Sequence, residues 1–133
     1  MAYHQGMGPM FSYEANESES LKQSLIKRIE SEAEHCFVAI QNELIVGCCF
    51  SRINDLPSFM GIKRTGYIAE TVVSDACRGK GIGQSLVEKT LGYFKEKGCN
   101  AVELQVAVQN PKGIKFWEKL GFSPSTYHMH KVF

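Results

Sequence analysis

The sequence lacks several features that would assign it to a functional class at once. No apolar run approaches the roughly 20 residues that span a bilayer, so we expect no membrane-spanning segment. Neither sign of charge is in excess, because 15 Lys and Arg face 14 Asp and Glu; a dedicated nucleic-acid-binding protein would show a basic excess. Residues 1–7 have neither the basic nor the apolar region of a signal peptide. We therefore expect a cytoplasmic protein without a nucleic-acid or membrane partner.

The five cysteines form no pattern that indicates a disulfide framework or a metal site. Their number is odd, no two are separated by two residues, and Cys48 and Cys49 are adjacent within an apolar run. We expect Cys36, Cys48, Cys49 and Cys99 to be reduced thiols in the core, with no bound metal. Cys77 stays open to a functional interpretation because it adjoins a glycine-rich loop.

The composition is that of one folded domain spanning residues 1–133. The chain is 44% hydrophobic and 22% charged, which is typical of a globular protein. A chain of this length buries enough surface to fold without a metal or a disulfide.

The hydrophobic pattern predicts an α/β (α+β) fold with a mixed sheet. A helix follows an acidic capping segment at 16–19, with Leu21, Leu25, Ile29 and Ala33 on one face and Arg28 among the charged residues on the others. Strands are predicted at 36–40, 44–53, 67–73 and 101–108, with a hairpin turn at 41–43 and a loop at 54–66. A second helix ends near Lys97 with Gly98 as its cap, and a short third helix runs from 110 to Gly121. Residues 122–133 are predicted to form a final strand or hairpin, and residues 1–10 do not read as a strand.

The most informative segment is a strand that runs into a glycine-rich loop at the start of a helix. Gly79, Gly81 and Gly83 alternate there, and Arg78 and Lys80 add positive charge. Glycine lets an anion approach the backbone closely, and the free amides of a helix N-terminus favour phosphate. The spacing matches neither the Walker loop nor the dinucleotide fingerprint. A tight turn without a ligand would also use glycines, but the two flanking cations favour a phosphate site.

Arg78, Gly81 and Gly83 after a strand resemble the acetyl-CoA pyrophosphate motif of the GNAT superfamily of N-acetyltransferases. A second segment, residues 110–122, is similar to that family's N-x-x-A-I-x-F-Y-E-K-x-G-F pattern. The two motifs are correctly ordered, and the resemblance covers residues from about Phe37 to the end. Residues 71–81 are especially similar to glucosamine-phosphate N-acetyltransferases, but the longer downstream segment argues against adopting their substrate.

The resemblance implies a mostly antiparallel sheet flanked by helices, with acetyl-CoA bound where a β-bulge splays a parallel strand pair. The pair would be 67–73 and 101–108. Backbone groups of Val72 and Val73 would pair with the pantetheine arm, and one N–H would polarise the thioester carbonyl. Asn110 would contact the pantetheine, and Phe116 would pack against the cofactor. The diphosphate-binding residues would be Arg78, Gly79, Lys80, Gly81, Ile82, Gly83 and Gln84.

Glu70 is the leading candidate for the general base. An alkyl ammonium, with a pKa of about 10.4, must lose a proton before it can attack a thioester. Glu70 lies just before the expected bulge in an otherwise apolar strand. An outward-facing glutamate, or one paired with Lys63 or Arg64, explains the residue equally well, because the pattern does not tell which face Glu70 occupies.

The sequence departs from the family pattern at Trp117, where many members have a tyrosine that protonates the departing thiolate. Indole donates a hydrogen bond but is no acid near pH 7, although a thiol with a pKa near 8.5 leaves without much help. Tyr67, Tyr127 and Cys77 are weak candidates to replace this acid, and structural roles are favoured for all three. His35 is ambiguous in the same way, and so are His128 and His130, which would share one face of the final strand.

The sequence thus predicts acetyl transfer from acetyl-CoA to a primary amine of a small molecule or a peptide. A non-catalytic CoA-binding or regulatory module is the alternative, motivated by Trp117, and an interaction domain without a ligand is a third reading. A homodimer is an expectation from the resemblance alone.

Overall fold

The structure is a computed structural model that describes residues 2–5, 26–28, 30, 31, 33–59 and 61–133. Residues 26–28 and 30 are helical, and the capping segment predicted at 16–19 lies outside the described residues. The strands and helices that follow one another along the chain are β1 (Ala2–Gln5), β2 (His35–Gln41), β3 (Leu44–Ser58), β4 (Gly61–Val73), the 3₁₀ turn η2 (Asp75–Cys77), α2 (Ile82–Glu96), β5 (Ala101–Glu103) and α3 (Pro111–Lys119).

The described strands form a single sheet in the order β1-β2-β3-β4-β5. Neighbouring strands are antiparallel except for β4 and β5, which are parallel. This confirms the prediction of a mixed, mostly antiparallel sheet. No helix in the described part of the chain is long and apolar enough to cross a membrane.

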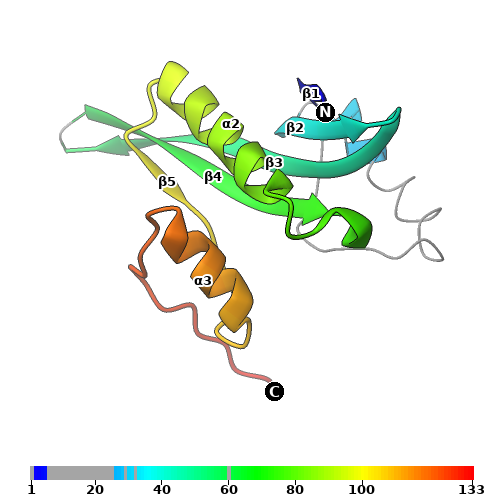
Figure 1. The fold of residues 1–133 in the computed structure, drawn as a ribbon. Helices are drawn as coiled ribbons and strands as arrows, with labels where there is room; N and C mark the ends of the chain where they lie inside the picture. The colour runs from blue at the N-terminus through cyan, green and yellow to red at the C-terminus, as the bar shows by residue number, and fades with distance from the viewer. Residues whose placement is uncertain (1, 6–25, 29, 32, 60) are drawn as a thin grey trace.

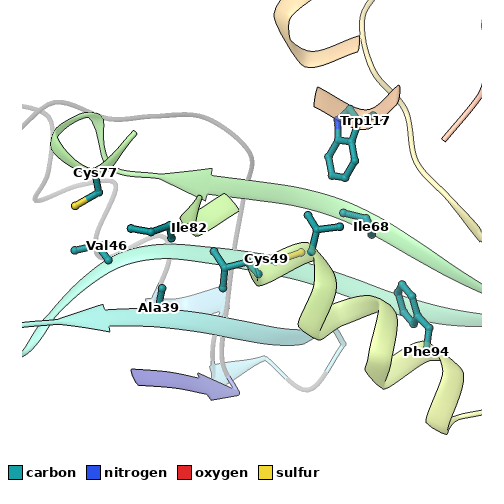
Figure 2. Packing of buried hydrophobic residues seen from close by; sticks show 10 residues of the cluster. Ala39, Val46, Cys49, Ile68, Cys77, Ile82, Phe94 and Trp117 are labelled. Atoms are coloured by element: carbon teal, nitrogen blue, oxygen red, sulfur yellow. The ribbon is translucent and has the colours of Figure 1, made fainter. Parts of the chain in front are cut away.

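Two apolar clusters hold the sheet, one on each face. Helix α2 lies across one face, and α3 lies beside β5 (Figure 1). Ile82, Leu86, Val87 and Phe94 of α2 pack there against the sheet, together with Trp117 of α3. In Figure 2, Trp117 and Phe94 lie at one end of this cluster and Cys77 lies near Val46 at the other. The opposite face buries Cys36, Val38, Cys48, Phe50 and Val72.

The local signals for turns and helix ends are confirmed. Asn42 and Glu43 both have positive φ, as a two-residue hairpin between Gln41 and Leu44 requires. Helix α2 ends at Glu96 and is followed by Gly98 in the left-handed region. Asn110 caps α3 through its side-chain oxygen, with Pro111 in the first turn.

The prediction of a loop at 54–66 is wrong. Strands β3 and β4 continue through this region and pair as far as Ser58 and Gly61. Strand β2 pairs with β3 only up to Ser51, so Pro57 lies in a two-stranded extension of the sheet, where a missing N–H is tolerated on the open side. Gly66 is not a loop glycine but a strand residue over which the Phe94 ring packs.

Three other expectations about strands are corrected. Residues 2–5 do form a strand, which pairs with Phe37–Ile40 of β2. Only Ala101–Glu103 of the predicted strand 101–108 is paired. Residues 122–133 have no regular secondary structure. Alternating apolar residues favour a strand only where a neighbouring edge accepts their hydrogen bonds, and no described strand pairs with 122–133.

Candidate active site

The central feature of the site is an open edge of β4. Phe50 pairs with Glu70 while the next residue, Ser51, pairs with Ile68, so Ala69 is the additional residue of a β-bulge. The parallel pairing of β4 with β5 ends at Tyr67 and Glu103. Beyond that point the chain that follows β5 leads away to α3 (Figure 1). Along Ile68–Val73, therefore, no described strand occupies the side of β4 that faces β5. The predicted bulge and the splayed pair are both present.

The open edge leads directly into the glycine-rich loop. After η2, Gly79 and Gly81 adopt positive φ of 77° and 80°, and Gly81 is the N-cap of α2 without a side-chain hydrogen bond. The first helical amides have no intrahelical acceptor. Within the described residues, no amide from Gly79 to Gln84 donates to a backbone carbonyl. A Cβ at Gly79 or Gly81 would have no neighbour within 4 Å, so the turn is open for close approach.

Positive charge lies beside this turn, as predicted. Arg78 and Lys80 are exposed. The Arg78 guanidinium lies 3.4 Å from a carboxylate oxygen of Asp75, a surface ion pair that contributes little to stability. The loop thus combines amides without a backbone acceptor, a helix N-terminus and two cations, a combination suited to a diphosphate.

Residues of three elements converge at the start of α2. A Cβ at Gly83 would lie 3.5 Å from the Val73 side chain and 3.6 Å from the Phe116 ring, so β4, α2 and α3 meet there. Val72 is buried and pairs with Cys48. Asn110 uses its side-chain oxygen to accept from the Gly113 amide at 3.0 Å. That contact gives Asn110 a structural role, and its contact with a pantetheine arm stays a prediction.

Glu70 lies on the sheet face opposite α2. It directly follows the bulge at Ala69, whereas the prediction placed it just before the bulge. Its Oε1 accepts a hydrogen bond of 2.6 Å from Nη1 of Arg28. Arg28 also makes a two-pronged pair with Glu34, at 2.6 and 2.8 Å. Burial opposes the charge of Arg28, but the hydrogen bonds to Glu34 and Glu70 outweigh it and raise the pKa of the guanidinium.

Glu70 is therefore paired, as the alternative interpretation predicted, but its partner is Arg28 and not Lys63 or Arg64. Arg64 binds Asp55 and the Lys97 carbonyl instead. Sequence reasoning missed Arg28 and Glu34 as residues of the site. The pattern places Arg28 only on a face other than the apolar one, and Arg28 lies 42 positions from Glu70, so no local pattern connects the two.

Trp117, at the position of the usual family tyrosine, is a core residue. It is only 6% exposed and makes edge contacts with the rings of Phe116 and Phe122. Of the suggested substitutes, Cys77 is buried, Tyr67 lies under the guanidinium of Arg52, and Tyr127 is exposed. His128 and His130 are exposed outside any strand, which corrects the expectation that they share a strand face.

The remaining titratable candidates have structural surroundings. Burial raises the pKa of the Cys36 and Cys49 thiols and raises that of Cys48 to about 12, so these thiols are inert, as predicted. His35 stacks on Tyr93 with ring centroids 3.7 Å apart. It lines a groove of about 810 Å³ between β2 and α2. This groove contains neither Glu70 nor any residue predicted to bind acetyl-CoA. Among the described residues, no cluster of three or more His, Cys, Asp or Glu could hold a metal ion.

Comparison with known proteins identifies the class to which this fold belongs. The chain is 37% identical over 87 residues to N-alpha-acetyltransferase 30 from Xenopus laevis, covering 65% of this chain and 31% of that protein. It is 36% identical over 70 residues to glucosamine 6-phosphate N-acetyltransferase from Arabidopsis thaliana, covering 53% and 45%. An aminoglycoside N-acetyltransferase in complex with CoA has the same fold, with a TM-score of 0.72, 15% identity and coverage of 99% and 98%.

These similarities define an acetyltransferase fold. Residues 4–122 match the model of the acetyltransferase (GNAT) family, and the chain belongs to that family. The resemblance inferred from the two motifs is thereby confirmed. The chain spans 31% of the length of the Xenopus laevis relative and 45% of the length of the Arabidopsis thaliana relative.

Proposed function

We propose that this chain transfers an acetyl group from acetyl-CoA to a primary amine by direct attack. The observation that carries the proposal is the open edge of β4, which continues into a loop whose amides have no backbone acceptor. An open edge offers backbone donors and acceptors to an extended ligand, and the pantetheine arm of acetyl-CoA is such a ligand. The diphosphate would then lie on the amides of Gly79–Gln84, with Arg78 and Lys80 beside it and Phe116 packed against the cofactor.

The chemistry assigned to the residues is simple. An N–H on the open edge, from Val72 or Val73, polarises the thioester carbonyl and stabilises the oxyanion that forms. In other enzymes the loss of one such donor lowers the rate about 10²–10³-fold. The amine nitrogen forms a bond to the carbonyl carbon, the carbon–sulfur bond breaks, and CoA leaves as a thiolate. Glu70 receives the proton that the amine loses. Trp117 need not supply an acid, because a thiolate, whose thiol has a pKa near 8.5, is a weak enough base to leave unprotonated.

Binding of acetyl-CoA to the glycine-rich loop is tested by calorimetry with two alanine variants. Gly81 and Gly98 lie at the two ends of α2 with almost the same positive φ, 80° and 78°, so alanine introduces comparable backbone strain at both. Gly81→Ala should weaken acetyl-CoA binding at least about tenfold, or 1.4 kcal/mol, and Gly98→Ala should leave it unchanged. Equal effects of the two variants, or no binding by the unmodified chain, would remove the proposal.

The base role of Glu70 makes a separate prediction. Glu70→Gln keeps the shape of the side chain but removes the carboxylate, so the transfer rate should fall about 10²-fold or more. The pH profile of the rate should also shift, because no carboxylate then takes the proton from the amine. Acetyl-CoA binding, measured in parallel, should be unaffected. If the variant and the unmodified chain have the same rate at every pH, Glu70 is not the base.

The acceptor is addressed by a panel of amines in an assay that detects the released thiol. The relatives support three classes: the N-terminus of a peptide, glucosamine 6-phosphate and an aminoglycoside. A second candidate function is a CoA-binding module without transfer. It is favoured by Trp117, because a buried indole at the position of the usual tyrosine supplies no acid. That function predicts acetyl-CoA binding with no thiol release for any amine of the panel. A homodimer and a cytoplasmic location remain expectations.

A further inference from the structure

Arg28 is held from three sides on the face of the sheet opposite α2. Glu34 accepts from Nε and Nη2, at 2.6 and 2.8 Å, and Glu70 accepts from Nη1 at 2.6 Å. The guanidinium carbon lies 3.8 Å from the centroid of the Phe50 ring. All three charged side chains are partly buried, with exposed fractions of 25% for Arg28, 15% for Glu34 and 34% for Glu70.

The two carboxylates play different parts in this arrangement. The two-pronged pair with Glu34 fixes the guanidinium plane and neutralises it. The ring of Phe50 adds a cation–π contact below that plane. The remaining prong is directed at Glu70, so the contact to Glu70 does more than balance the charge of Arg28.

The position of Glu70 gives that contact a consequence for the reaction. Glu70 pairs with Phe50 of β3 beside the bulge at Ala69, close to the point where β4 and β5 separate. A glutamate side chain that is free to rotate loses conformational entropy whenever it adopts one geometry. A base must lie within about 2.6–3.2 Å of the proton that it accepts, and misplacement by about 1 Å can cost 10²-fold in rate.

We propose that Arg28, anchored by Glu34, is a positioning residue that holds the Glu70 carboxylate in its reactive orientation at the open edge of β4. The proposal rests on the proposed function. It adds to that function a second residue pair, supplied by the segment before β2, on which transfer depends.

The test is a double-mutant cycle with Glu70. Arg28→Met keeps the aliphatic stem but removes the guanidinium. We expect it to lower kcat about tenfold, with the KM for acetyl-CoA changed less than about twofold, because the glycine-rich loop is untouched. Glu34→Gln, which loosens the anchor, should lower kcat in the same way but less. Arg28→Lys, which keeps the charge without the fork, should restore part of the loss. In a Glu70→Gln background none of these changes should lower kcat further.

Arg52→Met is the matched control. This arginine also rests on a ring of the sheet, with its guanidinium carbon 4.3 Å from the centroid of Tyr67. Its replacement should leave kcat unchanged. All rates are measured with the best acceptor of the amine panel, and folding of each variant is checked by circular dichroism. If Arg28→Met does not fold, Glu34→Gln in both backgrounds carries the same test.

The outcomes separate the inference from the proposed function. If the losses from Arg28→Met and Glu70→Gln multiply, Arg28 acts elsewhere and the inference is overturned while acetyl transfer stands. A loss confined to the KM for acetyl-CoA would also overturn it. If the unmodified chain binds no acetyl-CoA or acetylates no amine, the proposed function fails and the positioning role fails with it.

Discussion

At the scale of single residues, the contact between Gly66 and Phe94 decides how closely α2 packs on the sheet. A Cβ at Gly66 would lie 2.5 Å from the Phe94 ring, and Phe94 is fully buried. The ring cannot move aside in a close-packed interior. Glycine is therefore required here for close approach and not for a turn.

Two glycine-to-alanine changes test this with opposite signs. Gly66→Ala should destabilise the protein by about 1–3 kcal/mol through overpacking. Gly92→Ala should stabilise it by about 0.5–1 kcal/mol, because Gly92 lies inside α2 with nothing within 4 Å of its would-be Cβ. Urea unfolding measures both. Equal stability of Gly66→Ala and the unmodified chain would mean that Phe94 is not packed as described.

At the scale of elements, the stacked pair of His35 and Tyr93 joins β2 to α2. Burial, helped by the positive charge of Lys97, lowers the pKa of His35 below its ordinary value of 6.5. A histidine with a lowered pKa in the folded state binds its proton more readily when the chain unfolds. Its contribution to stability is therefore present above pH 6.5 and is lost as the pH falls toward the lowered value.

The measurement is the urea midpoint between pH 7.5 and pH 5.5. The unmodified chain should lose stability over this interval, and His35→Gln, which has no proton to bind, should lose less. The other histidines are the same in both proteins, so whatever they contribute cancels in the comparison. An identical loss in the two proteins would contradict the assignment to His35.

At the scale of the whole molecule, the ligand should join parts of the chain that are distant in sequence. The open edge of β4, the glycine-rich loop and the Phe116 ring of α3 face one region, whereas the groove between β2 and α2 contains none of these residues. A ligand that bridges β4, α2 and α3 stabilises the folded state as a unit.

Saturation with acetyl-CoA should protect the amides of 72–73 and 79–84 from hydrogen exchange and leave the hairpin extension at 53–58 unchanged. At about 100 times the dissociation constant, stability should rise by about 2.7 kcal/mol. Pantetheine, which lacks the diphosphate, serves as the control and should protect the loop much less. Protection centred on the groove between β2 and α2 would place the ligand elsewhere.

Much of the site could be predicted because it is local in the chain. The N-cap of α3 and the end of α2 satisfy their hydrogen bonds within a few residues, and the glycine-rich loop depends on the φ angles of its own glycines, so short motifs specify all three. The partner of Glu70 could not be predicted, because Arg28 lies on a separate segment and reaches it only through packing over Phe50.

The sequence by itself thus determined the hairpin turn at 41–43, the helix ends and the glycine turn at 79–81, because backbone sterics and capping act over neighbouring positions. Tertiary structure alone decided how far the strands extend. It extended β3 and β4 through Pro57 and Gly66, ended β5 at Glu103 and left 122–133 unpaired. The physical reason is that a strand is completed by the hydrogen bonds of another strand, and that partner is chosen by the whole fold.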